Sequence, residues 1–236
     1  MTYYAVRIIT ISVWEWALMS EIMTSRFFTR DDPQLNKPLL KLPEIWWSRP
    51  YEYAWASSFI SRDHVVLDAG CGICHPFKYY LCTLCENVYA CDKDERLLSK
   101  VHILREMISV FGEQALDFPL LYLSLPYVSR QDISATTYDA AMFDHVICIS
   151  VLEHLVAGEI LKTLVEFRRI IKPDGLILIT IDYPYLSLDL FDQMVKESGL
   201  SYAGPVSFAL PVDALTTALF PEFPEGIFSF RAILKK

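Results

Sequence analysis

Residues 65–77 read V-V-L-D-A-G-C-G-I-C-H-P-F, and the remainder of the chain can be interpreted outward from them. Strand-type residues run into Gly70 and Gly72, and an apolar helical pattern begins directly after Pro76. This order predicts a strand, a tight glycine turn and the N-terminus of a helix. Because glycine has no Cβ and tolerates positive φ, a ligand can approach the backbone of such a turn closely. The stretch therefore predicts a nucleotide-binding site.

Strands alternate with helices along the chain that follows. Short apolar runs predict further strands at residues 87–91, 127–131, 143–149, 176–181, 202–208 and 227–234. Amphipathic patterns predict helices at residues 48–60, 77–85, 94–110, 160–171 and 188–198. The helix at 94–110 is expected to bury Leu97, Val101, Leu104 and Ile108, and K-P-D-G at 172–175 is expected to stop a helix and turn the chain. Such alternation implies parallel pairing with right-handed crossovers, and so a doubly wound α/β sheet.

Five of the predicted strands end at a polar side chain, namely Asp68, Asp92, Asp132, Ser150 and Asp182. Ligands of doubly wound sheets bind outside the carboxyl ends of the strands. Asp92 lies 24 residues after Asp68, where a carboxylate can accept both hydroxyl hydrogens of a ribose. This spacing predicts a nucleoside-containing cofactor and does not separate nicotinamide from S-adenosylmethionine. His75 stands where a pyrophosphate-binding fingerprint has its third glycine, which disfavours a dinucleotide.

The charge balance favours a small-molecule substrate over nucleic acid. The chain has 21 Lys and Arg against 29 Asp and Glu, a net charge of −8, and no basic stripe. Arg7 and Glu15 interrupt the apolar N-terminal region, so we expect no membrane span. The N-terminal region lacks a basic segment followed by an apolar core, so we expect no secretory signal. A cytoplasmic location is therefore expected.

The cysteines could be mistaken for a zinc site. Cys71 and Cys74 form one C-x-x-C pair, and Cys82 and Cys85 form another, but only seven residues separate the pairs. In zinc ribbons the pairs lie about 15–20 residues apart. We expect buried thiols and no metal.

Residues 1–43 are expected to form an N-terminal extension, with the main domain at residues 44–236. Residues 1–24 are apolar and favour a helix, for which a packing arm, a lid over the substrate or a dimer contact are the alternatives, so that a homodimer through this segment is possible. The helix predicted at 48–60 is the most aromatic part of the chain. It would cover the core or close over the bound cofactor or substrate, and Arg49 would then meet a carboxylate.

Five motifs in order resemble the class I S-adenosylmethionine-dependent methyltransferases, of the small-molecule, ubiquinone-biosynthesis-like type. They are V-L-D-A-G-C-G (66–72), Y-A-C-D (89–92), Q-D-I (131–133), F-D-H-V-I-C-I-S-V-L-E-H (143–154) and I-I-K-P-D-G-L-I-L-I-T (170–180). The resemblance runs from about residue 43 to the C-terminus. It implies a Rossmann-like sheet of seven strands, mostly parallel with an antiparallel last strand, preceded by an N-terminal helical extension.

The resemblance also implies how S-adenosylmethionine is held. The backbone around Gly70, Cys71 and Gly72 would bind the methionine end, and Asp68 would anchor the turn. The remaining contacts would be Asp92 to the ribose, Asp132 to the adenine amino group, Ile133 and Lys93 beside the adenine ring, and Ile149 and Ser150 under the sulfonium. One departure is Cys74, where many members have a third glycine.

Methyl transfer is an in-line displacement at a carbon that the positive sulfur already activates, so positioning and desolvation supply much of the acceleration. A general base matters only for an acceptor that loses a proton. The candidate catalytic residues are His154 and Tyr183, near the ends of two strands. The sequence favours methyl transfer to a small-molecule acceptor. The alternatives are a nicotinamide-dependent oxidoreductase and a non-catalytic, methyltransferase-like binding or scaffold subunit.

Overall fold

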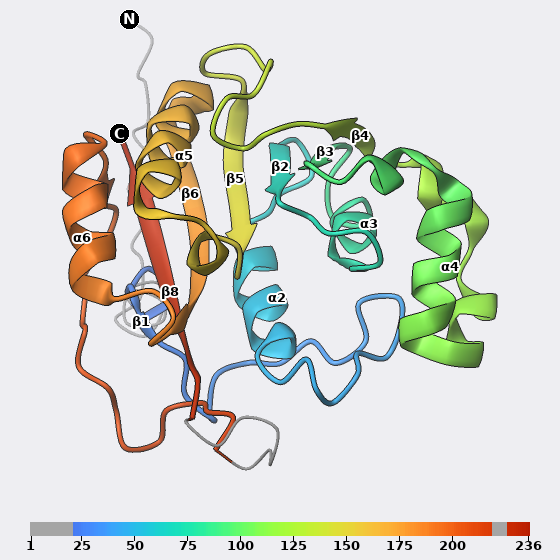
Figure 1. Ribbon diagram of the computed structural model, residues 1–236, viewed down its shortest axis with the longest axis horizontal. Helices are drawn as coiled ribbons and strands as arrows, with labels where there is room; N and C mark the ends of the chain where they lie inside the picture. Colours follow the sequence, from blue (N-terminus) through green and yellow to red (C-terminus); the bar gives the residue numbers. More distant parts are fainter. Residues whose placement is uncertain (1–20, 219–225) are drawn as a thin grey trace, which may run out of the picture.

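The computed structural model describes residues 21–218 and 226–236. The helix expected within residues 1–24 therefore lies almost wholly outside the described residues. A single mixed sheet forms the centre of the molecule, and helices cover both of its faces (Figure 1).

The sheet has the strand order β1-β8-β6-β5-β2-β3-β4, and β7 also pairs with β8. Its strands are β1 (Arg26–Phe27), β2 (Val65–Ala69), β3 (Asn87–Asp92), β4 (Tyr127–Arg130), β5 (Phe143–Ile149), β6 (Ile171–Tyr183), β7 (Ser201–Tyr202) and β8 (Phe228–Lys235). The five strands from β4 to β6 along this order pair in parallel, and β8 runs antiparallel to each of its neighbours. The predicted doubly wound, mostly parallel sheet with an antiparallel last strand is confirmed.

The predicted number of seven strands is wrong, because the described residues contain eight. The additional strand is β1, which pairs with β8 through Arg26 and Phe27 and is too short to leave a pattern in the sequence. The strand predicted at 202–208 shrinks to the two residues of β7. Pro205 follows closely and has no backbone N–H to donate to a neighbouring strand, which explains the early end.

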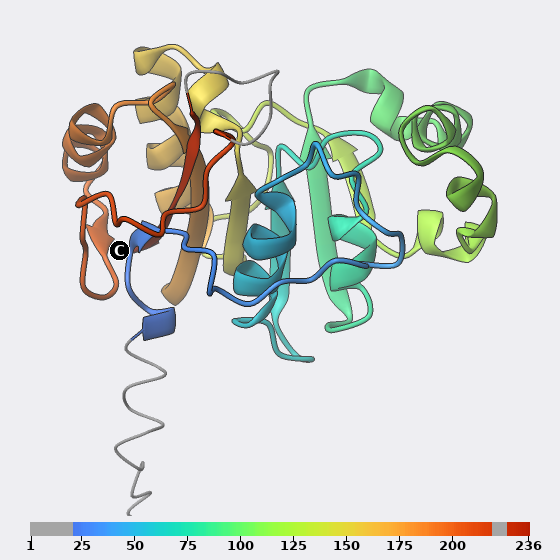
Figure 2. The ribbon, with the colours of Figure 1, turned by 90° about the horizontal axis from the view of Figure 1, so that it is seen from below.

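Helices lie on both faces of the sheet, as the view from below in Figure 2 shows. On one face lie α5 (Ala157–Ile170) and α6 (Leu188–Glu197). On the opposite face lie α2 (Arg49–Ser57), α3 (Phe77–Leu81) and α4 (Lys100–Phe111). The chain before α2 runs across this second face, where it buries Phe28, Leu40 and Leu42.

The helix expected at 94–110 is split in two, and the expected buried side is wrong. A 3-10 turn, η1 (Glu95–Leu98), comes first, and α4 starts after Ser99, whose hydroxyl accepts the backbone N–H of His102 at 3.4 Å. This new start rotates the helix, so that Ile103, Met107 and Phe111 are buried. Val101 and Ile108 are exposed.

The expected turn at 172–175 is incorporated into a strand. Helix α5 does end at Ile170, but β6 begins at once, with Ile171 paired to Phe143. The next aligned pair is His145 with Leu176, so residues 172–175 form an irregularity where β6 pairs with β5. No helix in residues 21–218 or 226–236 has the length and apolar character needed to cross a membrane.

Candidate functional site

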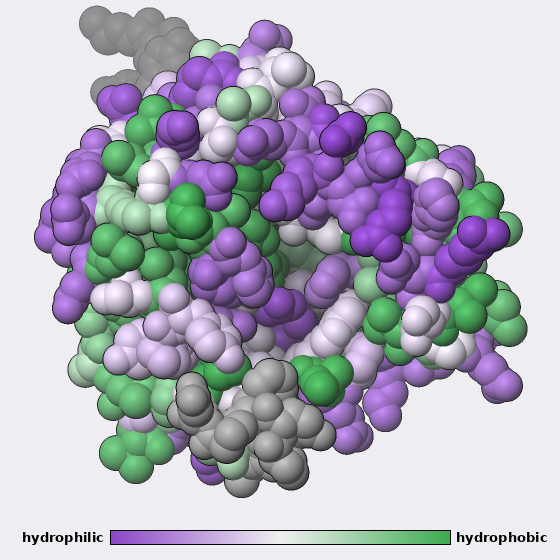
Figure 3. Space-filling view, viewed as in Figure 1, coloured by the Kyte–Doolittle hydropathy of each residue, from purple (hydrophilic) through white to green (hydrophobic). Residues whose placement is uncertain are grey.

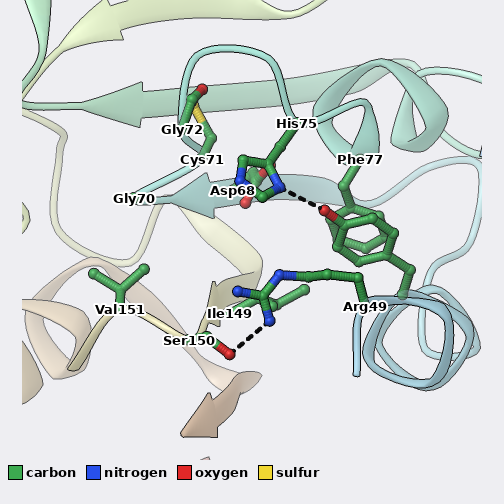
Figure 4. A pocket seen from close by; sticks show the side chains of 11 residues that line it. Arg49, Asp68, Gly70, Cys71, Gly72, His75, Phe77, Ile149, Ser150 and Val151 are labelled. Atoms are coloured by element: carbon green, nitrogen blue, oxygen red, sulfur yellow. Dashed lines mark hydrogen bonds between the residues drawn. The ribbon is translucent and has the colours of Figure 1, made fainter. Parts of the chain in front are cut away.

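Two cavities meet at the carboxyl ends of β2 and β5, where Gly70, Ser150 and Val151 line both. The larger cavity has a volume of about 310 Å³ and extends toward the ends of β3 and β4. The smaller cavity, of about 70 Å³, lies between the glycine turn and helix α2 (Figure 4). A hollow is visible near the middle of the molecule in the space-filling view of Figure 3. The cavities lie where a doubly wound sheet is expected to bind its ligand.

All ten predicted cofactor-binding residues line one or both of these cavities. The larger cavity is lined by Asp92, Lys93, Asp132 and Ile133, the smaller one by Asp68, Cys71, Gly72 and Ile149, and both by Gly70 and Ser150. The fold thus brings together side chains that are as far apart in the sequence as Asp68 and Ser150. Their individual roles remain predictions.

The glycine turn has the conformation that its sequence predicts. Gly70 has φ +72° and Gly72 has φ +60°, values that side chains with a Cβ rarely adopt. A Cβ on Gly70 would lie 2.7 Å from a methyl group of Val151. The backbone N–H groups of Gly70 and Cys71 both donate to the carbonyl of Cys91, at 2.9 and 3.0 Å, which ties the turn to β3.

The acidic residues of the larger cavity are fixed in orientation without a ligand. Asp92 accepts the backbone N–H of Gly72 on Oδ2 and that of Asp94 on Oδ1, each at 3.0 Å. Asp132 accepts the backbone N–H and the hydroxyl of Ser134 on Oδ1, at 2.9 and 2.8 Å, and these bonds lower its pKa. Each carboxylate retains acceptor capacity toward the cavity, since a carboxylate offers about four acceptor sites.

Helix α2 contributes a buried network that sequence reasoning missed. Arg49 donates to Ser150 Oγ at 2.7 Å and to the carboxylate of Glu52. The hydroxyls of Ser150 and Ser229 both donate to Glu52 Oε1 at 3.0 Å, and Glu52 is completely buried. Burial lowers the pKa of Arg49, but its neighbours, Glu52 first and then Tyr53 and Asp182, together raise it above its ordinary value. Arg49 was predicted to meet a carboxylate, and within this structure that carboxylate is its own neighbour on α2.

The backbone of Ser150 is strained at the junction of the two cavities. Its φ is +48°, although it has a side chain. Its backbone N–H donates to the carbonyl of Thr180 at 2.9 Å, and its side chain is held by Arg49 and Glu52. These contacts from α2 and β6 keep the hydroxyl at the cavity wall (Figure 4).

Aromatic residues close the smaller cavity. The hydroxyl of Tyr53 and Nδ1 of His75 are 3.0 Å apart and joined by a hydrogen bond. The ring of Trp46 stacks on His75 with centroids 4.2 Å apart. Burial, with the positive charges of Arg49 and Lys78, lowers the pKa of His75 well below its ordinary value. His75 is therefore a neutral wall of the cavity at physiological pH.

Three carboxyl groups at this edge of the sheet, those of buried Asp68 and of half-buried Glu153 and Asp182, have raised pKa values. Burial raises the pKa of Asp68 to about 7, although the ammonium of Lys78 opposes the shift. Burial and then Asp182 raise the pKa of Glu153 to about 8, and burial and then Glu52 raise that of Asp182 to about 7. The backbone N–H of Asp182 donates to Glu153 Oε1 at 3.3 Å.

These shifts predict that the protein becomes less stable as the pH rises from 6.5 to 8. In this window the three carboxyl groups bind protons in the folded state but are ionised in the unfolded state, so raising the pH favours unfolding. A proton that is bound in the folded state but not in the unfolded state changes the free energy of unfolding by about 1.4 kcal/mol per pH unit. Between pH 6.5 and 8 we expect a total loss of about 2 kcal/mol.

Urea denaturation at pH 6.5, 7.25 and 8 measures this loss, and Glu153→Gln should reduce the slope because it removes the group with the highest pKa of the three. A free energy of unfolding that is constant or rises over the same range would contradict the assignment.

The two candidate catalytic residues lie in different surroundings. His154 ends a short 3-10 turn, η4 (Leu152–His154), and its exposed side chain lines the larger cavity. Tyr183 ends β6, lines neither cavity and packs edge-on against Phe27, with ring centroids 5.6 Å apart. The structure therefore brings His154, but not Tyr183, to the predicted cofactor residues.

The cysteines are free thiols, and five of the six are buried. Within residues 21–218 and 226–236, no three His, Cys, Asp or Glu side chains are arranged to hold a metal ion. Burial raises the pKa of Cys82 to about 12 and that of Cys85 to about 11, so these thiols are protonated at neutral pH.

Comparison with protein families gives one match relevant to this site. Residues 67–179 match the family model described as "Methyltransferase domain". The matched segment begins in β2 and ends within β6, so it contains the glycine turn and the acids of both cavities. A search of curated proteins finds no significant match.

Solved structures share the fold at low sequence identity. A TehB-like SAM-dependent methyltransferase from Corynebacterium glutamicum is 17% identical, with a TM-score of 0.52 over 78% of this chain and 86% of that one. The YcgJ protein from Bacillus subtilis is 14% identical, with a TM-score of 0.50 over 78% and 95% of the two chains. The [4+2]-cyclase SpnF is 10% identical, with a TM-score of 0.55 over 93% and 92%. The fold is thus the Rossmann-like one that the sequence predicts.

Proposed function

We propose that the chain is a class I S-adenosylmethionine-dependent methyltransferase whose methyl acceptor is a small molecule, and the match of residues 67–179 to the methyltransferase family model supports this. The observation that carries the proposal is the convergence of all ten predicted cofactor residues on two joined cavities. The net charge of −8 disfavours nucleic acid as the acceptor.

The residues present fit the cofactor. The side chain of Asp68 is 4% exposed, lines the smaller cavity and accepts no hydrogen bond from another described residue, although a buried carboxylate normally has a partner. We assign this carboxylate to the ammonium of the methionine end. A Cβ on Gly70 would lie 2.7 Å from a methyl group of Val151, and one on Gly72 would lie 2.6 Å from the ring of His75, so only glycine fits this turn at the cavity wall.

The larger cavity is assigned to the adenosine. Asp92 would accept hydrogen bonds from the ribose hydroxyls and Asp132 from the adenine amino group, with Ile133 and Lys93 beside the ring. Ile149, the last residue of β5, and Ser150, which lines both cavities, would face the sulfonium. The cofactor supplies a methyl group made electrophilic by its positive sulfur. The chain orients the reactants and excludes water through Arg49, Tyr53 and the aromatic wall.

A proton is removed only if the acceptor must lose one. His154 is the candidate base, supported by its position on the wall of the larger cavity. Tyr183 is the second candidate, and it requires a movement that exposes its hydroxyl to the acceptor. Replacing His154 by Gln separates the two candidates, because the pH profile of the reaction changes only if His154 is the base.

Three further assignments belong to the same proposal. Residues 44–236 form the catalytic unit, and residues 21–43 act as a packing arm, which the burial of Phe28, Leu40 and Leu42 supports. A homodimer through the N-terminal segment is the proposed assembly, although residues 1–20 lie outside the described residues. A cytoplasmic location is supported by the six free cysteines.

A labelled-cofactor screen tests the proposed function. Calorimetric titration is expected to show one site for S-adenosylhomocysteine per chain. Incubation with methyl-labelled S-adenosylmethionine and a metabolite extract is expected to yield a labelled small molecule, identified by mass spectrometry. Label recovered only in protein or RNA, with none in the small-molecule fraction, would contradict the proposed acceptor class. No binding of S-adenosylhomocysteine would contradict the cofactor assignment.

A further inference from the structure

Lys78 is completely buried beside the glycine turn. It is the second residue of α3, with 0% of its surface exposed. Lysine is almost never fully buried without an anionic partner. Among the ion pairs of the described residues, none includes Lys78. Burial of this charge must therefore be compensated in another way.

The compensation comes from three carbonyl groups of one loop. The ammonium of Lys78 donates to the carbonyl oxygens of Gly72 and His75, each at 2.8 Å, and to that of Cys71 at 3.3 Å. An ammonium has three donors and no acceptor, so all of its hydrogen-bonding capacity is used on this loop. The loop from Cys71 to His75 is thus held from within the protein.

The buried ammonium also sets the charge around the smaller cavity. Its positive charge opposes the burial-driven rise in the pKa of Asp68 and helps to lower that of His75. The amino-acid end of S-adenosylmethionine carries one ammonium and one carboxylate. Asp68 can balance the ligand's ammonium, and the charge of Lys78 beneath the loop can balance its carboxylate.

We propose that Lys78 is a positioning residue for the amino-acid end of the cofactor, which fixes the loop from Cys71 to His75 and supplies a buried positive charge beneath it. The inference rests on the proposed placement of the methionine end in the smaller cavity. A lysine immediately inside the first turn of an apolar helix appears in the sequence as an ordinary exposed residue, and only its burial reveals the role.

Two ligands that share the adenosine but differ in the amino-acid end test the proposal. S-adenosylhomocysteine has the zwitterionic end, and 5′-methylthioadenosine lacks it. Lys78→Met, which is similar in length but uncharged, is expected to lose about 30-fold or more in affinity for S-adenosylhomocysteine (roughly 2 kcal/mol, at 1.4 kcal/mol per tenfold). Its affinity for 5′-methylthioadenosine should change less than threefold. The control variant Lys196→Met, on the exposed face of α6, should change neither of the two affinities.

The charge is separated from the packing by Lys78→Arg. This variant keeps the positive charge, and we expect it to preserve the ratio of the two affinities even if both are lower. Equal losses for the two ligands in Lys78→Met would show a structural role only and overturn the proposal, as would no loss for either. If Lys78→Met does not fold, Lys78→Gln, with a donor for the nearest carbonyl, takes its place and has the same expected ratio.

The pH profile gives a second, independent readout. The charged groups around Asp68 are Lys78 from α3, Asp92 from β3 and Arg49 from α2, with neutral His75 on the same cavity. Because Asp68 must be ionised to hold an ammonium, the affinity for S-adenosylhomocysteine is expected to fall as the pH drops through about 7.

In Lys78→Met this fall should move to higher pH, since the charge that lowers the pKa of Asp68 is gone. An unshifted midpoint would overturn the electrostatic part of the proposal. If the wild-type protein binds neither ligand, the proposed function itself fails. If the wild-type protein binds both ligands but the Lys78 variants do not give the expected affinities, the inference about Lys78 fails and the proposed function stands.

Discussion

Asp92→Ala is expected to weaken the binding of S-adenosylmethionine by about 100-fold or more. Hydrogen bonds to a charged group contribute about 1.5–3 kcal/mol each, and the variant would lose the proposed ones from the ribose hydroxyls. It also leaves the backbone N–H groups of Gly72 and Asp94 without their acceptor. The turn and the ribose site therefore lose a shared support.

Calorimetric titration with S-adenosylhomocysteine measures this effect. Asp94→Ala is the matched control, since its backbone N–H still donates to Asp92 and its side chain lines neither cavity. Asp92→Asn, which retains one acceptor oxygen, should fall between the wild type and Asp92→Ala. An Asp92→Ala protein with wild-type affinity would show that the ribose lies elsewhere.

Arg49→Met is expected to lower the free energy of unfolding by about 3 kcal/mol, because it leaves the carboxylate of Glu52 buried without its cation. The hydroxyls of Ser150 and Ser229 still donate to Glu52, which keeps the loss at the lower end of the range for a broken buried pair. The variant also removes a wall of the smaller cavity, so cofactor affinity should fall as well.

Urea denaturation of two further variants separates pairing from general disruption. Arg62→Met breaks an ion pair with Glu86 whose side chains are 84% and 65% exposed, and it should cost less than about 0.5 kcal/mol. The double variant of Arg49→Met with Glu52→Gln should regain part of the loss, because no charge is then buried unpaired. An Arg49→Met protein no less stable than Arg62→Met would refute the compensation described for α2.

The parts of the fold that the sequence predicted well are those with a strong local pattern. Strand β5 matches its predicted residues because the apolar run at residues 146–149 ends at a polar residue, Ser150. The parts it predicted poorly depend on distant partners. Strand β1 exists only because β8 offers a free edge, and the buried side of α4 depends on a helix start at Ser99.

The candidate site was likewise predictable only in part from the sequence. The cofactor residues follow from the order of short motifs and from the rule that parallel strands present their carboxyl ends together. The network around Glu52 could not be predicted, because its contact with Ser229 joins residues 177 positions apart. Lys78 escaped notice for a different reason, since a lysine is assigned to the solvent by default.

The buried carboxylate of Glu52 also bears on which part of the chain is an independent folding unit. The segment that matches the methyltransferase family ends at residue 179, yet Glu52 lies before it and Ser229 after it, and β8 pairs along the outer side of β6. A fragment cut at residues 67 and 179 would expose the edge of β6 and leave the strained Ser150 without the side chains from α2 that hold it. The unit recognised by family comparison is therefore smaller than the smallest piece that should be expressed for biophysical work.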